Sequence, residues 1–265
     1  MSFVQCGSAV HHYRVRGDLS KQPLLVFING LGTDQRIWDP LLDVLPAQLA
    51  TLVYDLRGQG LSELGAGRHD VAALSDDLEL LLQHLGARCV VPVGFSMGGL
   101  VAQQFALAHP ERVSGLVLCA TAARIGSAES WGQRAEAVRR GGLAAVVDAV
   151  IERWFSEPFR ARSPQLVRGY RTLLERADPA GYLAALGLLA QADLSALMPR
   201  LSLPVLAVAG GADLATPPEL VRGLAERIAG AEFRLLAGAG HLLGVEQPEA
   251  LARAINEFLR GAGLV

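Results

Sequence analysis

The sequence predicts an α/β fold, in which a mostly parallel sheet of eight strands has helices on both faces and carries an inserted helical cap. Short apolar runs alternate along the chain with helical patterns. Strands that are apolar throughout are typical of a parallel sheet covered on both faces. The stretch 122–203 differs, because its pattern is helical with little strand character. We therefore expect a core formed by 1–121 and 204–265, and a cap formed by 122–203.

Six apolar runs predict the central strands, and each is short enough for a strand of ordinary length. In chain order they are 24–28, 51–54, 89–93, 115–119, 205–209 and 233–236. The stretch 9–16 before them predicts an antiparallel hairpin at one edge of the sheet.

Four segments outside the cap predict helices, at 70–85, 100–109, 218–229 and 248–260. The last two open with proline, which is frequent in the first turn of a helix. In the cap, the helical pattern is interrupted by four prolines, Pro158, Pro164, Pro179 and Pro199. These prolines divide the cap into several helices.

Composition and charge limit the classes of protein that this chain can represent. Hydrophobic residues make up 51% of the 265 residues and charged residues 19%, which excludes a disordered chain. No apolar run approaches the ~20 residues that span a bilayer, so we expect no membrane segment. The net charge is −2 and the basic residues are scattered. We therefore expect neither nucleic acid nor an acidic membrane as a partner, and the oligomeric state stays open.

The cysteines and the N-terminus predict a cytoplasmic protein. Cys6, Cys89 and Cys119 are odd in number and have no paired spacing, which fits a reducing compartment. The first residues show no basic start followed by an apolar stretch, so we expect no signal peptide.

The segment GFSMG at 94–98 lies between a predicted strand and a predicted helix. A serine in a G-x-S-x-G motif between strand and helix predicts a nucleophile elbow. The flanking Gly94 and Gly98 are required because larger side chains would collide with the sharp turn or with the helix. Ser96 is therefore the candidate nucleophile, exposed at the positive end of a helix.

Asp213 and His241 each come shortly after a predicted strand. Loops at the carboxyl ends of parallel strands lie at one edge of the sheet, so both residues should approach Ser96. The other five histidines all precede the cap, at 11, 12, 69, 84 and 109. The order Ser96, Asp213, His241 predicts a catalytic triad. The structural alternative is that Asp213 caps a turn in its glycine- and proline-rich loop.

An oxyanion hole requires two backbone N–H groups that point at the developing negative charge. Met97 follows the nucleophile and is the first candidate donor. Leu31, between Gly30 and Gly32 in the loop after the strand 24–28, is the second. A plain turn is the alternative for this loop.

Taken together, the motifs NGLGTD (29–34), WDP (38–40), YDLRG (54–58) and SMGG (96–99) resemble those of α/β-hydrolases. The segments LCATAARIG (118–126), IERWF (151–155) and DPAGY (178–182), with Trp131 and Arg134, resemble 3-oxoadipate enol-lactonases more narrowly. The resemblance implies an α/β-hydrolase fold and an ester-bond hydrolase that opens 3-oxoadipate enol-lactone to 3-oxoadipate through an acyl-enzyme on Ser96. It implies no metal and no organic cofactor.

The family's substrate carries a carboxylate, so the resemblance also implies a cation and an apolar wall near Ser96. The cap residues Arg124, Arg134, Trp131 and Trp154 are the candidates. Packing tryptophans and solvated arginines are the structural alternative.

Gln59 departs from the histidine usual at its position, and Leu242-Leu243-Gly244 departs from the usual Leu-Ser-Asn. We expect these departures to bear on substrate choice. They leave open a carboxylesterase or a hydrolase of carbon–carbon bonds in aromatic ring-cleavage products. A ligand-binding receptor on the same fold is a further alternative, from another class of protein.

Overall fold

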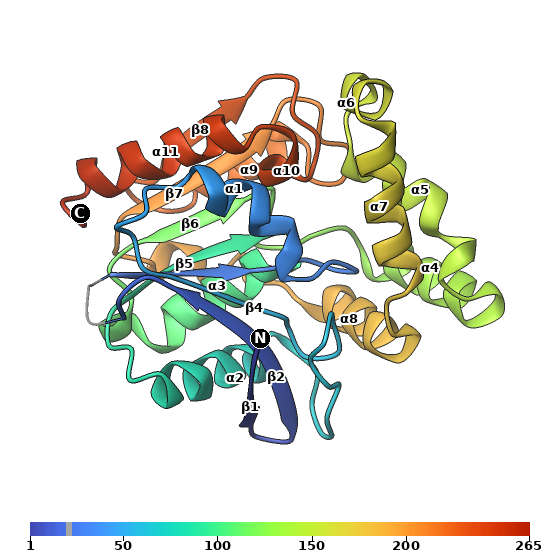
Figure 1. Cartoon of the computed structure of the whole chain (residues 1–265), viewed down its shortest axis with the longest axis horizontal. Coiled ribbons are helices and arrows are strands. Elements are labelled where there is room, and N and C mark those ends of the chain that lie inside the picture. Colours follow the sequence, from blue (N-terminus) through green and yellow to red (C-terminus); the bar gives the residue numbers. More distant parts are fainter. Residues whose placement is uncertain (20–22) are drawn as a thin grey trace.

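The computed structural model describes residues 1–19 and 23–265, and the strands in these ranges form one eight-stranded sheet (Figure 1). The strands are β1 (Ser2–Cys6), β2 (Ala9–Arg16), β3 (Leu24–Ile28), β4 (Thr51–Tyr54), β5 (Val90–Phe95), β6 (Leu116–Cys119), β7 (Val205–Gly210) and β8 (Glu232–Leu236). Their order across the sheet is β1-β2-β4-β3-β5-β6-β7-β8. The strands β3 to β7 are buried along their whole length, which explains their continuously apolar sequences.

The direction and register of the strands bring three loops to one place. β1 pairs antiparallel with β2 and β2 with β4, whereas the other pairs are parallel. Ile28 lies opposite Gly94, and Gly94 lies opposite Leu118. Because β3 and β6 end at this level, the loops that follow them flank the turn after β5.

Helices cover both faces of the sheet. They are α1 (Asp39–Val44), α2 (Val71–His84), α3 (Met97–Ala108), α4 (Ala128–Gly141), α5 (Val147–Trp154), α6 (Glu157–Arg162), α7 (Pro164–Glu175), α8 (Pro179–Gln191), α9 (Pro218–Ala225), α10 (Leu243–Glu246) and α11 (Pro248–Gly261). The short 3-10 helices are η1 (Gln35–Trp38), η2 (Pro110–Arg112), η3 (Leu143–Ala145) and η4 (Met198–Arg200). α1 and α11 pack on one core cluster, and α2 and α3 on the cluster of the opposite face.

Helices α4 to α8 lie between β6 and β7 in the chain, and we call residues 122–203 the helical insertion. In Figure 1, α4 to α7 stand beside the sheet rather than on its faces. Local signals define these helices: Ser127 caps α4, Ser156 caps α6 and Asp178 caps α8. Pro158, Pro164 and Pro179 lie in the first turns of their helices, where proline is tolerated.

The predicted α/β architecture is confirmed, and the differences are local. α3 begins at Met97 rather than at 100, because two early glycines weaken the helical pattern that the sequence shows. α9 ends at Ala225 rather than at 229. The short helices α1 and α10 were not predicted, since six and four residues are too few for a periodic pattern.

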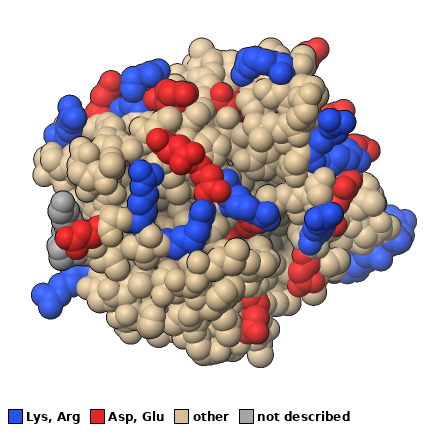
Figure 2. All heavy atoms as spheres, in the orientation of Figure 1, with Lys and Arg blue, Asp and Glu red and all other residues tan. Residues whose placement is uncertain are grey.

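Surface charge follows the scattered pattern of the sequence on the face drawn in Figure 2, where basic and acidic side chains are interspersed among uncharged areas. Among the helices of the described residues, none is both long enough and apolar enough to cross a membrane.

Candidate active site

Ser96 lies at the tight turn between β5 and α3, with φ of 53° and ψ of −119°. A positive φ is strained for a residue other than glycine, so surrounding contacts must hold it. The Ser96 N–H donates to the Cys119 carbonyl at 3.0 Å, and the Thr121 hydroxyl donates to the Ser96 carbonyl at 2.6 Å. The end of β6 and the loop after it therefore fix the N–H and the carbonyl of the serine.

The glycines around Ser96 are required by close packing. A Cβ atom on Gly94 would lie 2.6 Å from the Gly99 Cα atom and from the Gly98 carbonyl oxygen. A Cβ atom on Gly98 would lie 2.4 Å from the carbonyl oxygens of Ile28 and Asn29. These distances are far below van der Waals contact, so α3 can approach the sheet this closely only with glycine at both positions.

Asp213 and His241 are both buried and form a hydrogen-bonded pair. His241 Nδ1 lies 2.8 Å from Asp213 Oδ2. The other carboxylate oxygen, Oδ1, accepts the backbone N–H groups of Ala215 at 2.7 Å and Thr216 at 2.9 Å, and the Thr216 hydroxyl donates to Oδ2 at 2.7 Å. The carboxylate therefore has a fixed orientation toward the imidazole ring.

The protonation of this pair follows from its surroundings. Burial raises the pKa of Asp213, but attraction to His241 and hydrogen bonds from His241 and Thr216 outweigh burial, so the net pKa is lowered. An ionised Asp213 is only an acceptor, so His241 Nδ1 carries the proton of this hydrogen bond. In the neutral ring, Nε2 is then free to accept a proton. The Phe95 ring packs on the His241 ring at a centroid distance of 4.7 Å.

The predicted oxyanion donors lie beside Ser96, Met97 at the start of α3 and Leu31 in the loop after β3. Met97 is the first residue of α3, and the N–H groups of the first turn of a helix have no acceptor within the helix. Leu31 is half-buried in the loop after β3, and within residues 1–19 and 23–265 its N–H has no hydrogen-bond acceptor. Both groups are available to an oxygen atom bound beside Ser96.

Ser96, His241 and Leu31 line one cavity of about 310 Å³ between the core and the helical insertion. This volume is at the lower end of the range for small-molecule sites. Apolar parts of the wall are formed by Phe95 of the core and by six residues of the insertion, Ile125, Trp131, Val150, Trp154, Tyr182 and Leu189.

Two arginines face this cavity, and one of them was not predicted. Arg134 stacks over the Trp131 ring at 4.9 Å from its centroid, and Arg153 of α5 lies at the exposed rim. Neither has an acidic partner among the described residues, and no Asp or Glu occurs among the described residues that line the cavity. The cavity is therefore positively charged and suits an anionic ligand.

The structure does not bring Arg124 to this cavity. Its side chain is exposed, pairs with Asp193 at 3.4 Å, and lines a separate surface hollow of about 530 Å³ beside α9. Ala123 and Ile125 on either side are buried, and Ile125 lines the cavity of Ser96, whereas the guanidinium of Arg124 points to solvent. Arg124 is therefore corrected from a candidate substrate contact to a surface residue.

The departures at 242–244 lie away from the cavity of Ser96. Leu242, Leu243 and Gly244 are buried, and Gly244 packs against Leu41 and Leu251 rather than on the cavity wall. These residues shape the core behind His241. The sequence interpretation missed Thr216 and Thr121, although Thr216 follows Asp213 at the three-residue spacing typical of local side-chain turns.

A model of the alpha/beta hydrolase family matches residues 25–254. The chain belongs to the alpha/beta hydrolase family, as the resemblance in the sequence indicated.

Three individual proteins similar to this chain are two enol-lactonases and an esterase. The chain is 34% identical to 3-oxoadipate enol-lactonase 2 of Acinetobacter baylyi over 90% of this chain and 89% of the relative. It superimposes with a TM-score of 0.93 and 34% identity on the enol-lactonase of Burkholderia xenovorans LB400, covering 98% of this chain and all of that chain. A thermophilic esterase of Thermogutta terrifontis with malate bound gives a TM-score of 0.91 at 32% identity and 99% coverage of both chains. These similarities confirm the predicted class of enzyme, a hydrolase of ester bonds.

Proposed function

We propose that this enzyme opens a small anionic enol lactone, 3-oxoadipate enol-lactone, to 3-oxoadipate through an acyl-enzyme on Ser96. The observation that carries the proposal is the cavity in which Ser96 and His241 lie with Arg134 and Arg153, and in which no acidic side chain is found among the described lining residues. An anionic lactone would place its carboxylate on the arginines and its carbonyl at Ser96. The similarity to enol-lactonases supports the same substrate class.

In the proposed first step, His241 Nε2 takes the proton of the Ser96 hydroxyl as the oxygen attacks the lactone carbonyl. Asp213 keeps the ring in the correct tautomer and stabilises its positive charge. The N–H groups of Met97 and Leu31 hold the oxyanion. The ring C–O bond then breaks, His241 protonates the departing enol oxygen, and the acyl group stays on Ser96.

In the second step, a water molecule gives a proton to His241 and attacks the acyl carbonyl, which releases the acid and restores Ser96. The net change is the addition of one water molecule to the lactone. The released enol tautomerises to the ketone, which draws the reaction forward. The residues named here require neither a metal nor an organic cofactor for any of these steps.

We further propose that residues 122–203 act as a cap that sets substrate choice, while the core 1–121 and 204–265 carries out the chemistry. The residues assigned to proton transfer and oxyanion binding come from the core. Both arginines and both tryptophans assigned to the substrate come from the insertion. We place this activity in the cytoplasm.

A small anionic carboxylic ester is the second candidate substrate. The esterase of Thermogutta terrifontis supports it, because that structure of the same fold has malate, a small dicarboxylate, bound. The same triad and the same arginines would act on such an ester, and only the leaving group would differ.

The test is the loss of enol-lactone absorbance with the wild type and with Ser96→Ala, beside a panel of p-nitrophenyl esters and labelling with a fluorophosphonate. We expect fast lactone opening, labelling of the wild type, and loss of both in Ser96→Ala. Turnover of esters alone would retain the triad and reject the lactone. Absence of both turnover and labelling would favour a ligand-binding receptor, and full activity of Ser96→Ala would reject the mechanism.

A further inference from the structure

Gln59, which stands where enol-lactonases usually have histidine, contacts the loop that carries the Leu31 N–H. Its Oε1 atom accepts the backbone N–H of Gly32 at 2.8 Å, and the side chain is buried, with a relative exposure of 5%. Gln59 lines a separate hollow of about 350 Å³ and not the cavity of Ser96. It therefore contacts the loop of residues 29–34 from the side that faces away from the cavity of Ser96.

The peptide that carries the Leu31 N–H is fixed on its other side by Thr33. The Gly30 carbonyl belongs to the same planar peptide as the Leu31 N–H, and it accepts the Thr33 hydroxyl at 2.8 Å and the Thr33 N–H at 3.3 Å. In a trans peptide the carbonyl and the N–H point in opposite directions. Holding the Gly30 carbonyl toward Thr33 therefore sets the direction of the Leu31 N–H.

The peptide that follows Leu31 contains the Gly32 N–H, which is the group that Gln59 holds. Leu31 thus lies between two restrained peptide planes, one held by Thr33 and one by Gln59. Rotation about the Leu31 backbone would have to break one of these contacts. The neighbouring N–H groups of Gly30 and Gly32 are paired with Thr33 and Gln59, whereas no acceptor among the described residues pairs with the Leu31 N–H.

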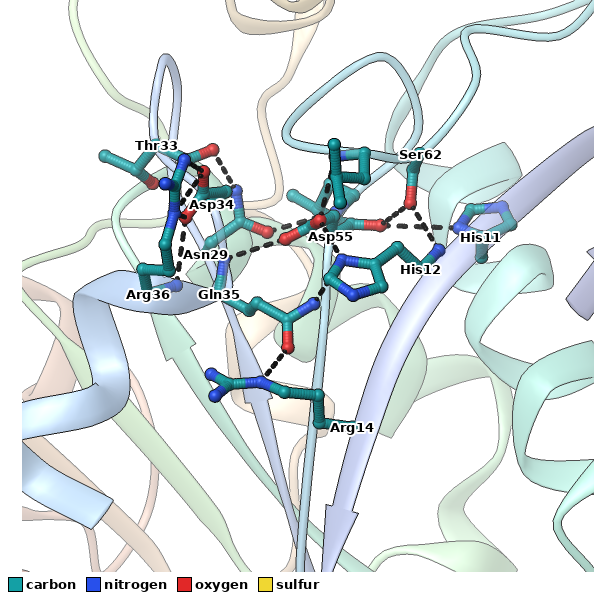
Figure 3. A network of polar contacts seen from close by, with 12 residues as sticks. His11, His12, Arg14, Asn29, Thr33, Asp34, Gln35, Arg36, Asp55 and Ser62 are labelled. Carbon is teal, nitrogen blue, oxygen red and sulfur yellow. Dashed lines mark hydrogen bonds and ion pairs between the residues drawn. The ribbon is translucent and has the colours of Figure 1, made fainter. Parts of the chain in front are cut away.

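The turn that carries Gln59 is itself anchored to the same loop. The Asp55 carboxylate accepts the N–H groups of Leu61 at 2.9 Å and Gln35 at 2.8 Å. The Asn29 side chain accepts the Leu56 N–H at 3.1 Å and donates to the Thr33 carbonyl at 2.7 Å. Figure 3 shows this network, in which Asp55 lies between the His12 ring and the segment 29–36. The contacts of Asp55 and Asn29 thus hold the turn that carries Gln59 next to Gly32, in addition to the hydrogen bond of the Gln59 side chain itself.

We propose that Gln59 is a positioning residue for the oxyanion hole, acting on the Leu31 N–H through Gly32. The proposal rests on the proposed role of Leu31 as an oxyanion donor, but it does not depend on which ester is the substrate. A donor that is aligned before the reaction stabilises the transition state without strengthening substrate binding. Loss of the Gln59 contact should therefore lower kcat and leave KM unchanged.

The test compares Gln59→Met, which keeps the length but removes the acceptor, with Gln59→His, which offers a ring nitrogen as an acceptor. Removal of a whole oxyanion donor costs about 10²–10³ in kcat, so a misaligned donor should cost about 10-fold in Gln59→Met. KM for p-nitrophenyl acetate should stay constant. The inhibition constant of a trifluoromethyl alkyl ketone, whose adduct on Ser96 carries an oxyanion, should rise by the same factor as kcat falls.

We expect Gln59→His to keep kcat within about threefold of the wild type, because it restores an acceptor for the Gly32 N–H. Gln83→Met, on the exposed face of α2, controls for the substitution itself, and the melting temperature of each variant controls for folding. The double variant Thr33→Val/Gln59→Met should lose a smaller factor in kcat than the product of the factors lost by the two single variants, because both side chains position the same N–H group.

The proposal is overturned if Gln59→Met keeps wild-type kcat, if KM rises instead, or if kcat falls with no change in the ketone's inhibition constant. Each outcome is measured with p-nitrophenyl acetate as the substrate, so the test stands even if the enol lactone is rejected as the substrate. Full activity of Ser96→Ala, or absence of both turnover and labelling in the wild type, would overturn the proposal together with the proposed mechanism.

Discussion

The link between Ser156 and Glu246 offers a quantitative test of how the helical insertion is attached to the core. Glu246, next to the loop of His241, is buried and accepts the Ser156 hydroxyl at 2.6 Å and the Ser156 N–H at 2.8 Å. Nearby, the Leu242 N–H donates to the Trp154 carbonyl at 3.1 Å. The end of α5 is therefore bonded directly to the segment that follows His241.

Ser156→Ala removes one hydrogen bond to a buried carboxylate, which is worth about 1.5–3 kcal/mol. The contact of Ser156 Oγ with the Phe159 N–H, at 3.4 Å, is long and adds little. We expect the free energy of unfolding to fall by about 2 kcal/mol, which lowers the melting temperature of a chain of this size by about 4–8 °C. Denaturant titration and calorimetry measure the two quantities.

Ser163→Ala is the matched control, because Ser163 precedes α7 in the same position but its side chain caps no N–H group. Its effect should stay within about 0.5 kcal/mol. Equal losses for the two variants, or a loss below about 0.5 kcal/mol for Ser156→Ala, would refute the inference that the buried carboxylate fastens the insertion.

Three further predictions follow from the charge and burial of individual side chains. The lowered pKa of Asp213 stabilises the fold above the unfolded value of about 3.9, and this contribution is lost as the pH falls through the lower folded pKa. The difference in unfolding free energy between wild type and Asp213→Asn should therefore shrink below about pH 4, and a constant difference from pH 3 to 6 would contradict this. Arg153→Ala should raise KM for an anionic ester about 10-fold, by loss of a charged contact, and leave a neutral ester unchanged. Arg124→Ala should leave KM unchanged for both the anionic and the neutral ester. An equal rise in KM for the anionic ester in both variants would argue against Arg153 as a cation of the cavity. Burial raises the pKa of Cys119 to about 12 and that of Cys6 to about 11, so a disulfide reagent at pH 8 should modify at most Cys89 in the native protein and all three thiols after unfolding.

The sequence was most informative where backbone geometry alone determines position. Ser96, Asp213 and His241 each follow a strand, and parallel strands bring their carboxyl ends to one edge whatever the side chains do. Gly94 and Gly98 were predictable for a similar reason, because the turn leaves no space for a Cβ atom.

The sequence was least informative where the direction of a side chain depends on docking between elements. Arg124 follows a strand closely, yet it points away from the cavity, whereas Arg153 on α5 reaches the rim. Their sequence neighbours do not distinguish them, since the facing side of a helix in the insertion depends on how the insertion packs. The contact of Gln59 with Gly32 was hidden in the same way, because the two residues are distant in the chain.

The charge of the cavity has a consequence for the end of the catalytic cycle. Hydrolysis of any ester leaves a carboxylate where a neutral carbonyl stood, so the product carries one more negative charge than the substrate. Arg134 and Arg153 then attract the product more strongly than the substrate. Salt should therefore accelerate the release of the product, because dissolved ions screen the attraction between the exposed Arg153 and the departing anion. The positive charge that draws substrate in is thus also what delays the enzyme's return to its free state.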